Sequence, residues 1–211
     1  MLLPIVIAAY VIGSLSFAVI VSRAFGLPDP HSYGSGNPGA TNVLRTGRKL
    51  AALLTLLGDG GKGWLAVYLA ARYAPQFDLG GELPLAMAAA ALAVFIGHLY
   101  PVFFQFRGGK GVATALGILL AFHPWLGLAA LATWLAVFGL TRVSSLSALT
   151  AGVLAPLYAW LLLDNRLSAM AILLMSALLL ARHADNIRRL LSGQEGGFGR
   201  KPAGESGAKS A

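Results

Sequence analysis

Recurring apolar segments, each separated from the next by a short polar stretch, constrain this chain more than any other feature. They predict helices over residues 2–21, 50–72, 84–104, 111–122, 125–141, 143–163 and 167–182. A helix that spans a bilayer takes about 20 mostly apolar residues. Only 11% of the 211 residues are charged, whereas a soluble domain has about 25%. The sequence therefore predicts an all-α polytopic membrane protein of about seven transmembrane helices.

Residues 111–141 are too long for one ordinary span, and His123-Pro124 interrupts them. Proline disfavours helical backbone in the residue before it, so this region forms either a hairpin of two short helices or one long kinked helix. Arg107 and Lys110 come just before this region, and Arg142 comes just after it. Cationic loops gather on the cytoplasmic side. Two such loops on one side require an even number of crossings, which favours the hairpin.

The same charge rule places the N-terminus outside and the C-terminus in the cytoplasm. Arg72 and Arg166 then fall outside, and Lys62 lies within a span. Positive-inside bias also explains the net charge of +8 better than nucleic-acid binding does, so we expect no nucleic-acid partner. The cations that would face the cytoplasm are Arg23, Arg45, Arg48, Lys49, Arg107, Lys110, Arg142, Arg182, Arg188, Arg189, Arg200, Lys201 and Lys209.

One membrane domain over residues 1–195 is expected. The first segment has no basic stretch before it and no small-residue cleavage site, so we expect a retained helix rather than a signal peptide. Residues 196–211 are rich in Gly, Ser and Lys and predict a disordered cytoplasmic tail whose cations can contact lipid headgroups. Cysteine is absent, which excludes disulfides, thiol catalysis and thiolate metal sites.

The stretch "GSGNPGATNVLRTGRK" over residues 34–49 differs sharply from its apolar surroundings. Its glycines allow a loop with positive φ, in which successive N–H groups form an anion-binding nest. It holds no acid, so nothing in it repels an anion. The bland alternative is a plain glycine-rich connector with membrane-proximal cations. If the stretch does bind an anion, its candidate ligands are Ser35, Gly36, Asn37, Thr41 and Asn42, together with the planar guanidinium of Arg45.

A second polar stretch, "GHLYPVFFQFRGGKGVAT" over residues 97–114, repeats this chemistry at the start of an apolar helix. A helix N-terminus suits phosphate because its N–H groups are free. The alternative is a cationic membrane anchor beside a glycine helix start. The candidate ligands are Gly108, Gly109, Lys110 and Gly111, and His98 is either a structural hydrogen-bonding residue or a catalytic one.

Neither glycine-rich stretch is a nucleotide-binding loop. "GSGNPG" matches G-x-G-x-x-G, but no strand precedes it. "FRGGKG" lacks the first glycine of a Walker A loop and has Gly111 where that loop has Ser or Thr.

A third polar stretch, "HADNIRRLLSGQE" over residues 183–195, places His183, Asn186 and Arg189 three residues apart. On a helix these side chains share one face, where His and Asn can bind an anion. The alternative is an amphipathic surface helix. Asp185 points elsewhere and would pair with an arginine or cap the helix.

Inside the second segment, "GDGGKG" puts Asp59 and Lys62 three residues apart. Ionisable groups within a span face the bundle interior and commonly pair. The pair is therefore structural, or it contacts substrate, or it serves ion transport.

The three polar stretches together resemble the bacterial acyl-phosphate:glycerol-3-phosphate acyltransferases, the PlsY family. The family's motifs resemble "GSGNPGATNVLR", "GHLYPVFFQFRGGKGVAT" and "HADNIRRLLSGQE", and "DGGKG" resembles its D-x-x-K-G element. The resemblance runs from about Tyr10 to Glu195 in the family's order and spacing. Departures are His31 where arginine is common, Arg107 where lysine is usual, and Ser16 and Ala18 in the first helix.

The resemblance implies acyl transfer from acyl phosphate to the 1-hydroxyl of glycerol 3-phosphate, the first acylation of phospholipid synthesis. It implies no cofactor, and the enzyme that makes acyl phosphate as a partner. It also implies a bacterial inner-membrane protein with seven helices and a cytoplasmic active site.

By resemblance, the glycerol 3-phosphate site comprises Arg45, Lys110, His183 and Asn186. The acyl-phosphate site comprises Ser35, Gly36, Asn37, Thr41, Asn42, Gly108, Gly109 and Gly111. His183, Ser35 and Asn186 are the catalytic candidates, and Asp59, Lys62 and His98 are supporting residues. The general base is either His183 or a substrate phosphate, and a covalent Ser35 is disfavoured because no base adjoins it in sequence.

Site chemistry alone leaves two other functions open. One is a phosphate or organophosphate transporter, for which no inverted repeat is evident. The other is a scaffold that binds anionic lipid, which would not need so many Gly, Asn and His residues. None of the four histidines precedes an Asp by five positions, which argues against acyl transfer from acyl-CoA or acyl carrier protein. The scattered histidines predict no metal site either.

Overall fold

The computed structural model describes residues 2–77 and 82–197. Within these ranges, every regular element is helical. The predicted tail falls, from residue 198 on, outside the described residues. The α-helices are α1 (Leu2–Gly13), α2 (Phe17–Ala24), α3 (Ala40–Leu44), α4 (Lys49–Tyr73), α5 (Leu83–Leu99), α6 (Val112–Phe122), α7 (Pro124–Thr141), α8 (Ser144–Leu162), α9 (Arg166–Arg182) and α10 (Ala184–Leu191), and short 3₁₀ helices follow α4 (Ala74–Phe77) and α5 (Val102–Phe104).

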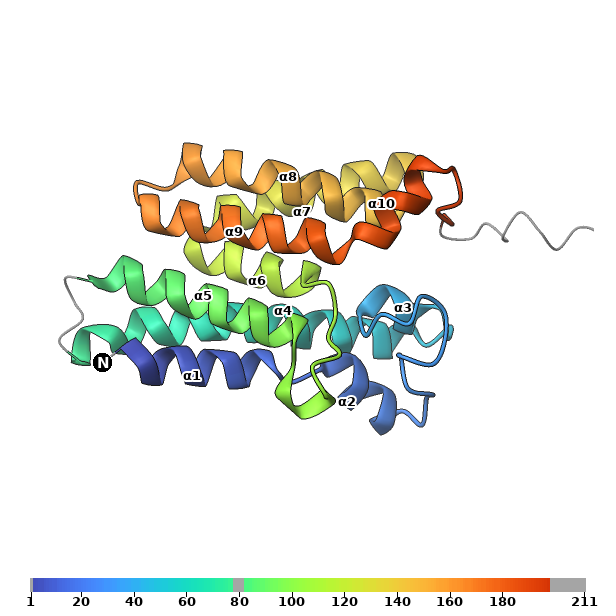
Figure 1. Ribbon diagram of the computed structural model, residues 1–211, viewed down its shortest axis with the longest axis horizontal. Helices are drawn as coiled ribbons and strands as arrows, with labels where there is room; N and C mark the ends of the chain where they lie inside the picture. Colours follow the sequence, from blue (N-terminus) through green and yellow to red (C-terminus); the bar gives the residue numbers. More distant parts are fainter. Residues whose placement is uncertain (1, 78–81, 198–211) are drawn as a thin grey trace, which may run out of the picture.

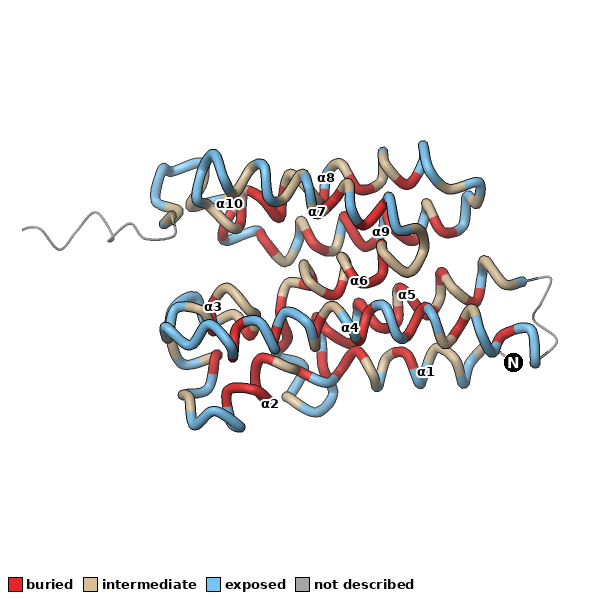
Figure 2. Tube along the Cα trace, turned by 180° about the vertical axis from the view of Figure 1, so that it is seen from behind, coloured by how far each residue is buried: buried red, intermediate tan, exposed pale blue. Residues whose placement is uncertain are grey.

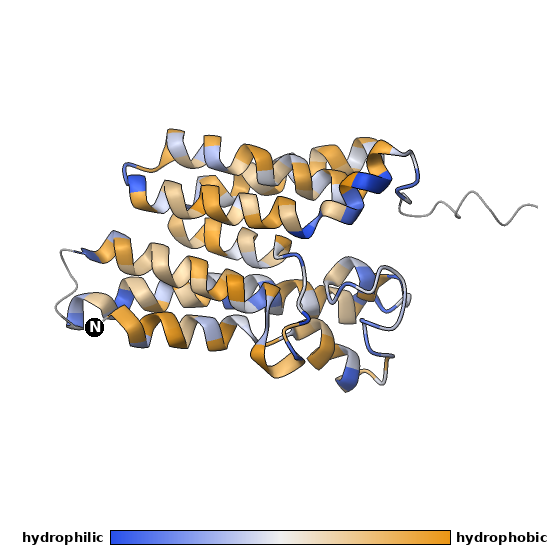
Figure 3. Cartoon of the chain, in the orientation of Figure 1, coloured by the Kyte–Doolittle hydropathy of each residue, from blue (hydrophilic) through white to orange (hydrophobic). Residues whose placement is uncertain are grey.

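The helices form two layers with α6 between them (Figure 1). One layer contains α1, α4 and α5, with α2 and α3 at one end, and the other contains α7, α8, α9 and α10. The short α6 packs against α4 on one side and α7 on the other. Buried positions concentrate on the helix faces that meet between and within the layers (Figure 2). Hydrophilic residues gather around α3, α10 and the nearby loops, at the end of the bundle away from the N-terminus (Figure 3).

The break between α6 and α7 confirms the predicted hairpin. His123 separates the two helices in extended backbone (φ −160°, ψ 128°), as expected for a residue that precedes proline. The two helices also pack against each other. The chain therefore turns back here and does not continue as one kinked helix.

The prediction of one continuous helix over residues 2–21 is wrong. The chain bends by 40° between α1 and α2, because polar groups compete with the helical hydrogen bonds there. The hydroxyl of Ser14 donates to the carbonyl of Tyr10 (2.9 Å). The ammonium of Lys62 donates to the carbonyl of Leu15 (2.6 Å). The charged side chain from α4 thus satisfies a carbonyl that the break releases.

Length and hydropathy identify four described helical stretches that can each cross a membrane: Lys49–Gln76, Leu83–Phe104, Pro124–Thr141 and Ser144–Leu162. The bent pairs α1–α2 and α9–α10 raise the number to six if each is one span. The apolar α6 is shorter than these. An all-helical membrane protein is confirmed, while the count of seven spans and the orientation of the termini stay predictions.

Glycines allow α4 and α6 to approach closely. A Cβ atom on Gly117 of α6 would collide with the carbonyl of Gly60, and one on Gly63 of α4 would collide with the carbonyl of Thr114. Small residues at crossing points are a common way to pack helices within a membrane. This crossing fixes the start of α6, which carries the second polar stretch, against α4.

Replacing Gly117 with alanine should therefore lower the thermal unfolding midpoint in detergent, because overpacking at a tight contact costs about 1–3 kcal/mol. Gly139 of α7 is the matched control, since a Cβ there meets nothing within 4 Å. Gly139→Ala should leave the midpoint unchanged or raise it, as alanine favours helix over glycine. A Gly117→Ala protein as stable as Gly139→Ala would contradict the tight crossing.

Candidate active site

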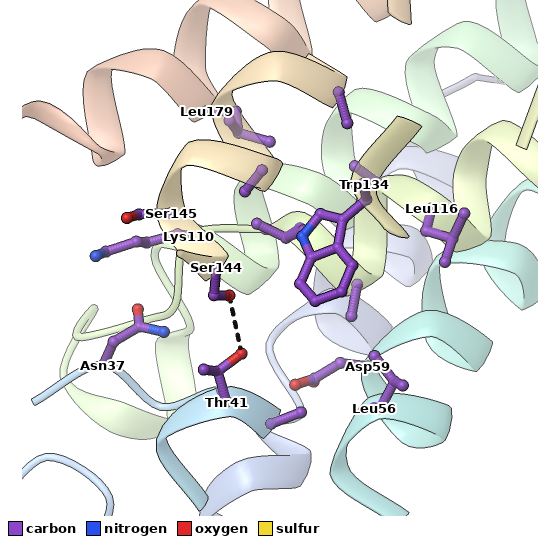
Figure 4. Close-up of a pocket in the computed structure, with 18 of the residues that line it drawn as sticks. Asn37, Thr41, Leu56, Asp59, Lys110, Leu116, Trp134, Ser144, Ser145 and Leu179 are labelled. Carbon is purple, nitrogen blue, oxygen red and sulfur yellow. Dashed lines mark hydrogen bonds between the residues drawn. The ribbon is translucent and has the colours of Figure 1, made fainter. Parts of the chain in front are cut away.

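The three polar stretches line one cavity of about 840 Å³ at the polar end of the bundle. The chain therefore brings together segments that lie up to about 150 residues apart in sequence. Figure 4 shows Asn37, Thr41 and Lys110 around its polar part, with Leu116 and Trp134 in its apolar part. Of the predicted site residues, the cavity is lined by Ser35, Asn37, Thr41, Asn42, Arg45, Asp59, His98, Lys110, Gly111, His183 and Asn186.

Asn42 of α3 shapes the first loop and has no amide proton left for a ligand. Its Oδ1 accepts the N–H of Ser35 (3.1 Å). Its Nδ2 donates to the carbonyls of Pro30 (2.9 Å) and Tyr33 (3.1 Å). Both amide protons are therefore used within the loop. These bonds favour a role in shaping the loop over the predicted role as a donor to acyl phosphate.

Three of the predicted glycine ligands do not line the cavity: Gly36, Gly108 and Gly109. Gly36 has φ +65°, which a turn requires and a side chain would strain. Gly108 and Gly109 are buried against the end of α5, where a Cβ would collide with the backbone of His98 and Leu99 or with the ring of His98. Their smallness therefore serves loop shape and packing.

A hydrogen bond connects the first loop to the other layer. The hydroxyl of Thr41 lies 3.2 Å from that of Ser144, at the start of α8, and the two share a hydrogen bond (Figure 4). Ser144 and the adjacent Ser145 both line the cavity. These two serines were not predicted as site residues, because hydroxyl residues at a helix start resemble ordinary helix caps.

Lys110 joins the second stretch to the third. Its ammonium donates to the Oδ1 of Asn186 on α10. Burial lowers the pKa of Lys110, the positive charge of Arg189 lowers it further, and the negative charge of Glu195 acts in the opposite direction. Positive charge that is not fully neutralised favours an anionic ligand at this place.

His183 lies at the 60° bend between α9 and α10, where its side chain is buried. Its Nδ1 lies 2.8 Å from the carbonyl of Leu179. A carbonyl only accepts, so Nδ1 carries the proton and the neutral ring keeps a free lone pair on Nε2. This tautomer can accept a proton from a hydroxyl group.

Glu195 follows α10 in the chain and lines the cavity, although it was not predicted as a site residue. Its carboxylate accepts hydrogen bonds from the Oγ of Ser145 (2.5 Å), the Nδ2 of Asn186 (2.6 Å) and the Nε of Arg189 (2.6 Å). Burial opposes the ionisation of Glu195, but these three bonds together hold its pKa below the ordinary value of 4.5. One acid beside several cations was the signal in the sequence.

The charged pair inside α4 is confirmed and belongs to a larger buried cluster. The ammonium of Lys62 lies 2.9 Å from Asp59, and the Nδ1 of His98 lies 3.6 Å from the same carboxylate oxygen. The carbonyl of His98 accepts the N–H of Gly109 (3.2 Å). The cluster thereby connects α4 to the second stretch. Asp59 and His98 also line the cavity, whereas Lys62 does not.

Replacing Glu195 with glutamine should lower the unfolding midpoint by several degrees at neutral pH, because all three of its hydrogen-bond partners lose a charged acceptor. The pKa of Glu195 is depressed in the folded state, so its stabilisation exists above pH of about 4.5 and disappears as the pH falls through the folded value. The midpoints of wild type and Glu195→Gln should therefore converge in acid. Asp185→Asn is the control, since the Asp185–Arg188 pair is exposed. A gap that stays constant down to pH of about 3 would contradict the assignment.

Comparison with known proteins agrees with this geometry. The family model described as glycerol-3-phosphate acyltransferase matches residues 3–193. A protein of Thiobacillus denitrificans named glycerol-3-phosphate acyltransferase is 62% identical over 199 residues, which are 94% of this chain and 98% of that protein. One of Methylobacillus flagellatus with the same name is 61% identical over 197 residues, 93% of this chain and 96% of that protein.

Two solved structures share the fold. Both are crystal structures of PlsY, described as an integral membrane glycerol 3-phosphate acyltransferase, and both are 36% identical to this chain. The glycerol 3-phosphate form has a TM-score of 0.85 and covers 94% of this chain and 96% of that one. The lysophosphatidic acid form has a TM-score of 0.83 and covers 94% and 95%. The chain belongs to the glycerol-3-phosphate acyltransferase family.

Proposed function

We propose that this protein transfers an acyl group from acyl phosphate to the 1-hydroxyl of glycerol 3-phosphate, giving lysophosphatidic acid and inorganic phosphate. One observation carries the proposal: a single cavity joins a cationic, amide-rich end to an apolar trunk. The names of the relatives, and the two ligands of the PlsY crystal structures, support the acceptor and the lipid product.

The polar end suits two phosphate groups. Two such anions repel each other at close range unless cations or N–H groups offset their charge. Three cationic side chains line this end: Arg45, Lys110 and Arg189. Arg45 is exposed, and the first stretch itself contains no acid that would compete with a phosphate. We assign glycerol 3-phosphate to Arg45, Lys110, His183 and Asn186, and acyl phosphate to Ser35, Asn37, Thr41 and Gly111.

The apolar trunk suits an acyl chain. From the polar end it runs along one face of α8 as far as Ala155 and along α9 as far as Ile172. Ser144 to Ala155 spans roughly 17 Å of helix, which is the scale of a long-chain acyl group. Leu53, Leu56 and Leu135 line the cavity, and all three side chains are exposed. The trunk is therefore open to a chain that arrives from the lipid.

The reaction needs little covalent assistance, because acyl phosphate is a mixed anhydride with a good leaving group. The 1-hydroxyl oxygen attacks the acyl carbon, the bond from that carbon to the phosphate oxygen breaks, and phosphate leaves with the bonding electrons. The hydroxyl proton goes either to Nε2 of His183 or to a substrate phosphate. Lys110 and the N–H groups at the start of α6 stabilise the charge on the phosphate, and positioning supplies much of the rate.

We also propose where the protein lies in the cell. We place the protein in the bacterial inner membrane with seven spans, its N-terminus outside and its C-terminus in the cytoplasm. Residues 1–195 then form one catalytic domain whose active site faces the cytoplasm, where glycerol 3-phosphate and the enzyme that makes acyl phosphate are available. The support is that hydrophilic residues gather at one end of the bundle (Figure 3) and that Arg45, Lys110 and Arg189 line the cavity there.

The direct test follows both products of purified protein in detergent with palmitoyl phosphate and glycerol 3-phosphate. We expect lysophosphatidic acid and inorganic phosphate in equal amounts, and a loss of at least about a hundredfold in kcat/KM for Lys110→Ala, as for removal of an oxyanion donor. Arg188→Ala, a change at an exposed position, is the control. Failure to form either product, with acyl-CoA inactive as well, would refute the proposal and direct the work to transport assays in liposomes.

Single substitutions separate the chemical routes. Ser35→Ala should keep most of kcat, because no base adjoins this serine in the sequence. If His183 is the base, His183→Ala should lower kcat at least about a hundredfold. A loss of less than about tenfold would instead assign the proton to a substrate phosphate. Inactive Ser35→Ala, together with a trapped acyl-enzyme, would contradict direct transfer.

A further inference from the structure

We propose that Arg182 and His31 are positioning residues, which hold the carbonyl groups of residues 107–109 away from the cavity so that the Gly108–Gly111 loop presents its phosphate-binding side. Neither residue lines the cavity, and neither has a role in the proposed reaction. The inference rests on the proposed function only in using the same phosphate site.

Three successive carbonyl groups of this loop are bound from outside the cavity. The Nε2 of His31 lies 3.0 Å from the carbonyl of Arg107. The Nη2 and Nε of Arg182 donate to the carbonyls of Gly108 (3.0 Å) and Gly109 (3.3 Å). Carbonyl oxygens that pointed into the cavity would repel a phosphate. Holding them outward removes that repulsion while Lys110 and Gly111 line the cavity.

The guanidinium of Arg182 is itself held in place. It lies 5.3 Å from the ring centroid of Tyr100, in a cation–π contact. It therefore binds two adjacent carbonyls as a fixed planar fork, which an ammonium group does not reproduce. Because Arg182 is the last residue of α9 and precedes His183, it links the second polar stretch directly to the third.

His31 performs the equivalent task from the first stretch. Its Nδ1 lies 2.6 Å from the carboxylate of Asp29, so the ring sits between a carboxylate and the carbonyl of Arg107. Both partners only accept hydrogen bonds, so each needs a donor from this position. An arginine at this position would also supply two donors.

The test compares Arg182→Gln and Arg182→Lys with the control Arg188→Gln. Two readouts are used: the affinity for inorganic phosphate, measured by its stabilisation of the protein against heat, and KM and kcat. We expect both Arg182 variants to bind phosphate about tenfold more weakly, with a parallel rise in KM for glycerol 3-phosphate and a change in kcat of less than about threefold. Arg188→Gln should match wild type.

His31 and Tyr100 provide independent variants. His31→Leu should weaken phosphate binding about threefold, while His31→Arg restores it. If the Arg182 variants fail to fold, Tyr100→Leu weakens the fork without removing it and should weaken phosphate binding about threefold.

Wild-type phosphate affinity in Arg182→Lys would overturn the inference, because charge alone would then suffice. So would unchanged phosphate affinity in Arg182→Gln or Tyr100→Leu. Phosphate binding is measured without turnover, so an inactive wild type that binds phosphate would refute the proposed function and leave this inference standing.

Discussion

The contact between Lys110 and Asn186 joins the two layers of helices at the point where the cavity is most polar. Lys110 is fixed to the layer of α4 and α5 through the start of α6, and Asn186 belongs to α10 in the other layer. A cation that is partly buried costs free energy unless polar groups surround it. The amide of Asn186, held in turn by Glu195, supplies one such partner. The two layers therefore meet around a positive charge that a phosphate can neutralise.

Packing far from the cavity makes this meeting possible. The glycine crossing of α4 and α6 sets the position from which the second stretch starts. Lys62 donates a hydrogen bond to the carbonyl of Leu15, which the α1–α2 break leaves without a helical partner. Its ion-pair partner Asp59 lines the cavity together with His98. The membrane interior penalises each unpaired polar group. Buried charges inside α4 thus connect a local break in the first helix with the geometry of the site.

Apolar runs in the sequence were sufficient to predict α4 to α9, because a span must be both long and apolar. The α6–α7 hairpin followed from His123-Pro124 and from the positions of the flanking cations. The α1–α2 break was missed because its causes, the hydroxyl of Ser14 and the ammonium of Lys62, act through contacts that are local in one case and distant in the other. The sequence of the first apolar run alone does not reveal the distant contact with Lys62.

For the site residues too, the sequence indicated the chemistry but not the contacts that form in the folded chain. Sequence chemistry indicated which stretches bind an anion, and Lys110, His183 and Asn186 do meet. It did not distinguish residues that are free to bind a ligand from those that shape a loop: Gly36, Gly108 and Gly109 do not line the cavity, and both amide protons of Asn42 are used within the first loop. It also passed over Ser145 and Glu195, whose importance arises only from what the fold places beside them.

A double-mutant cycle between Lys110 and Asn186 tests the central claim most directly. The measured quantity is kcat/KM for wild type, Lys110→Gln, Asn186→Ala and the double variant. If the two stretches form one site, the losses are not additive, and the coupling free energy exceeds about 1 kcal/mol. Losses that add within about 0.5 kcal/mol would show that the two residues act independently, and would contradict a single shared anion site.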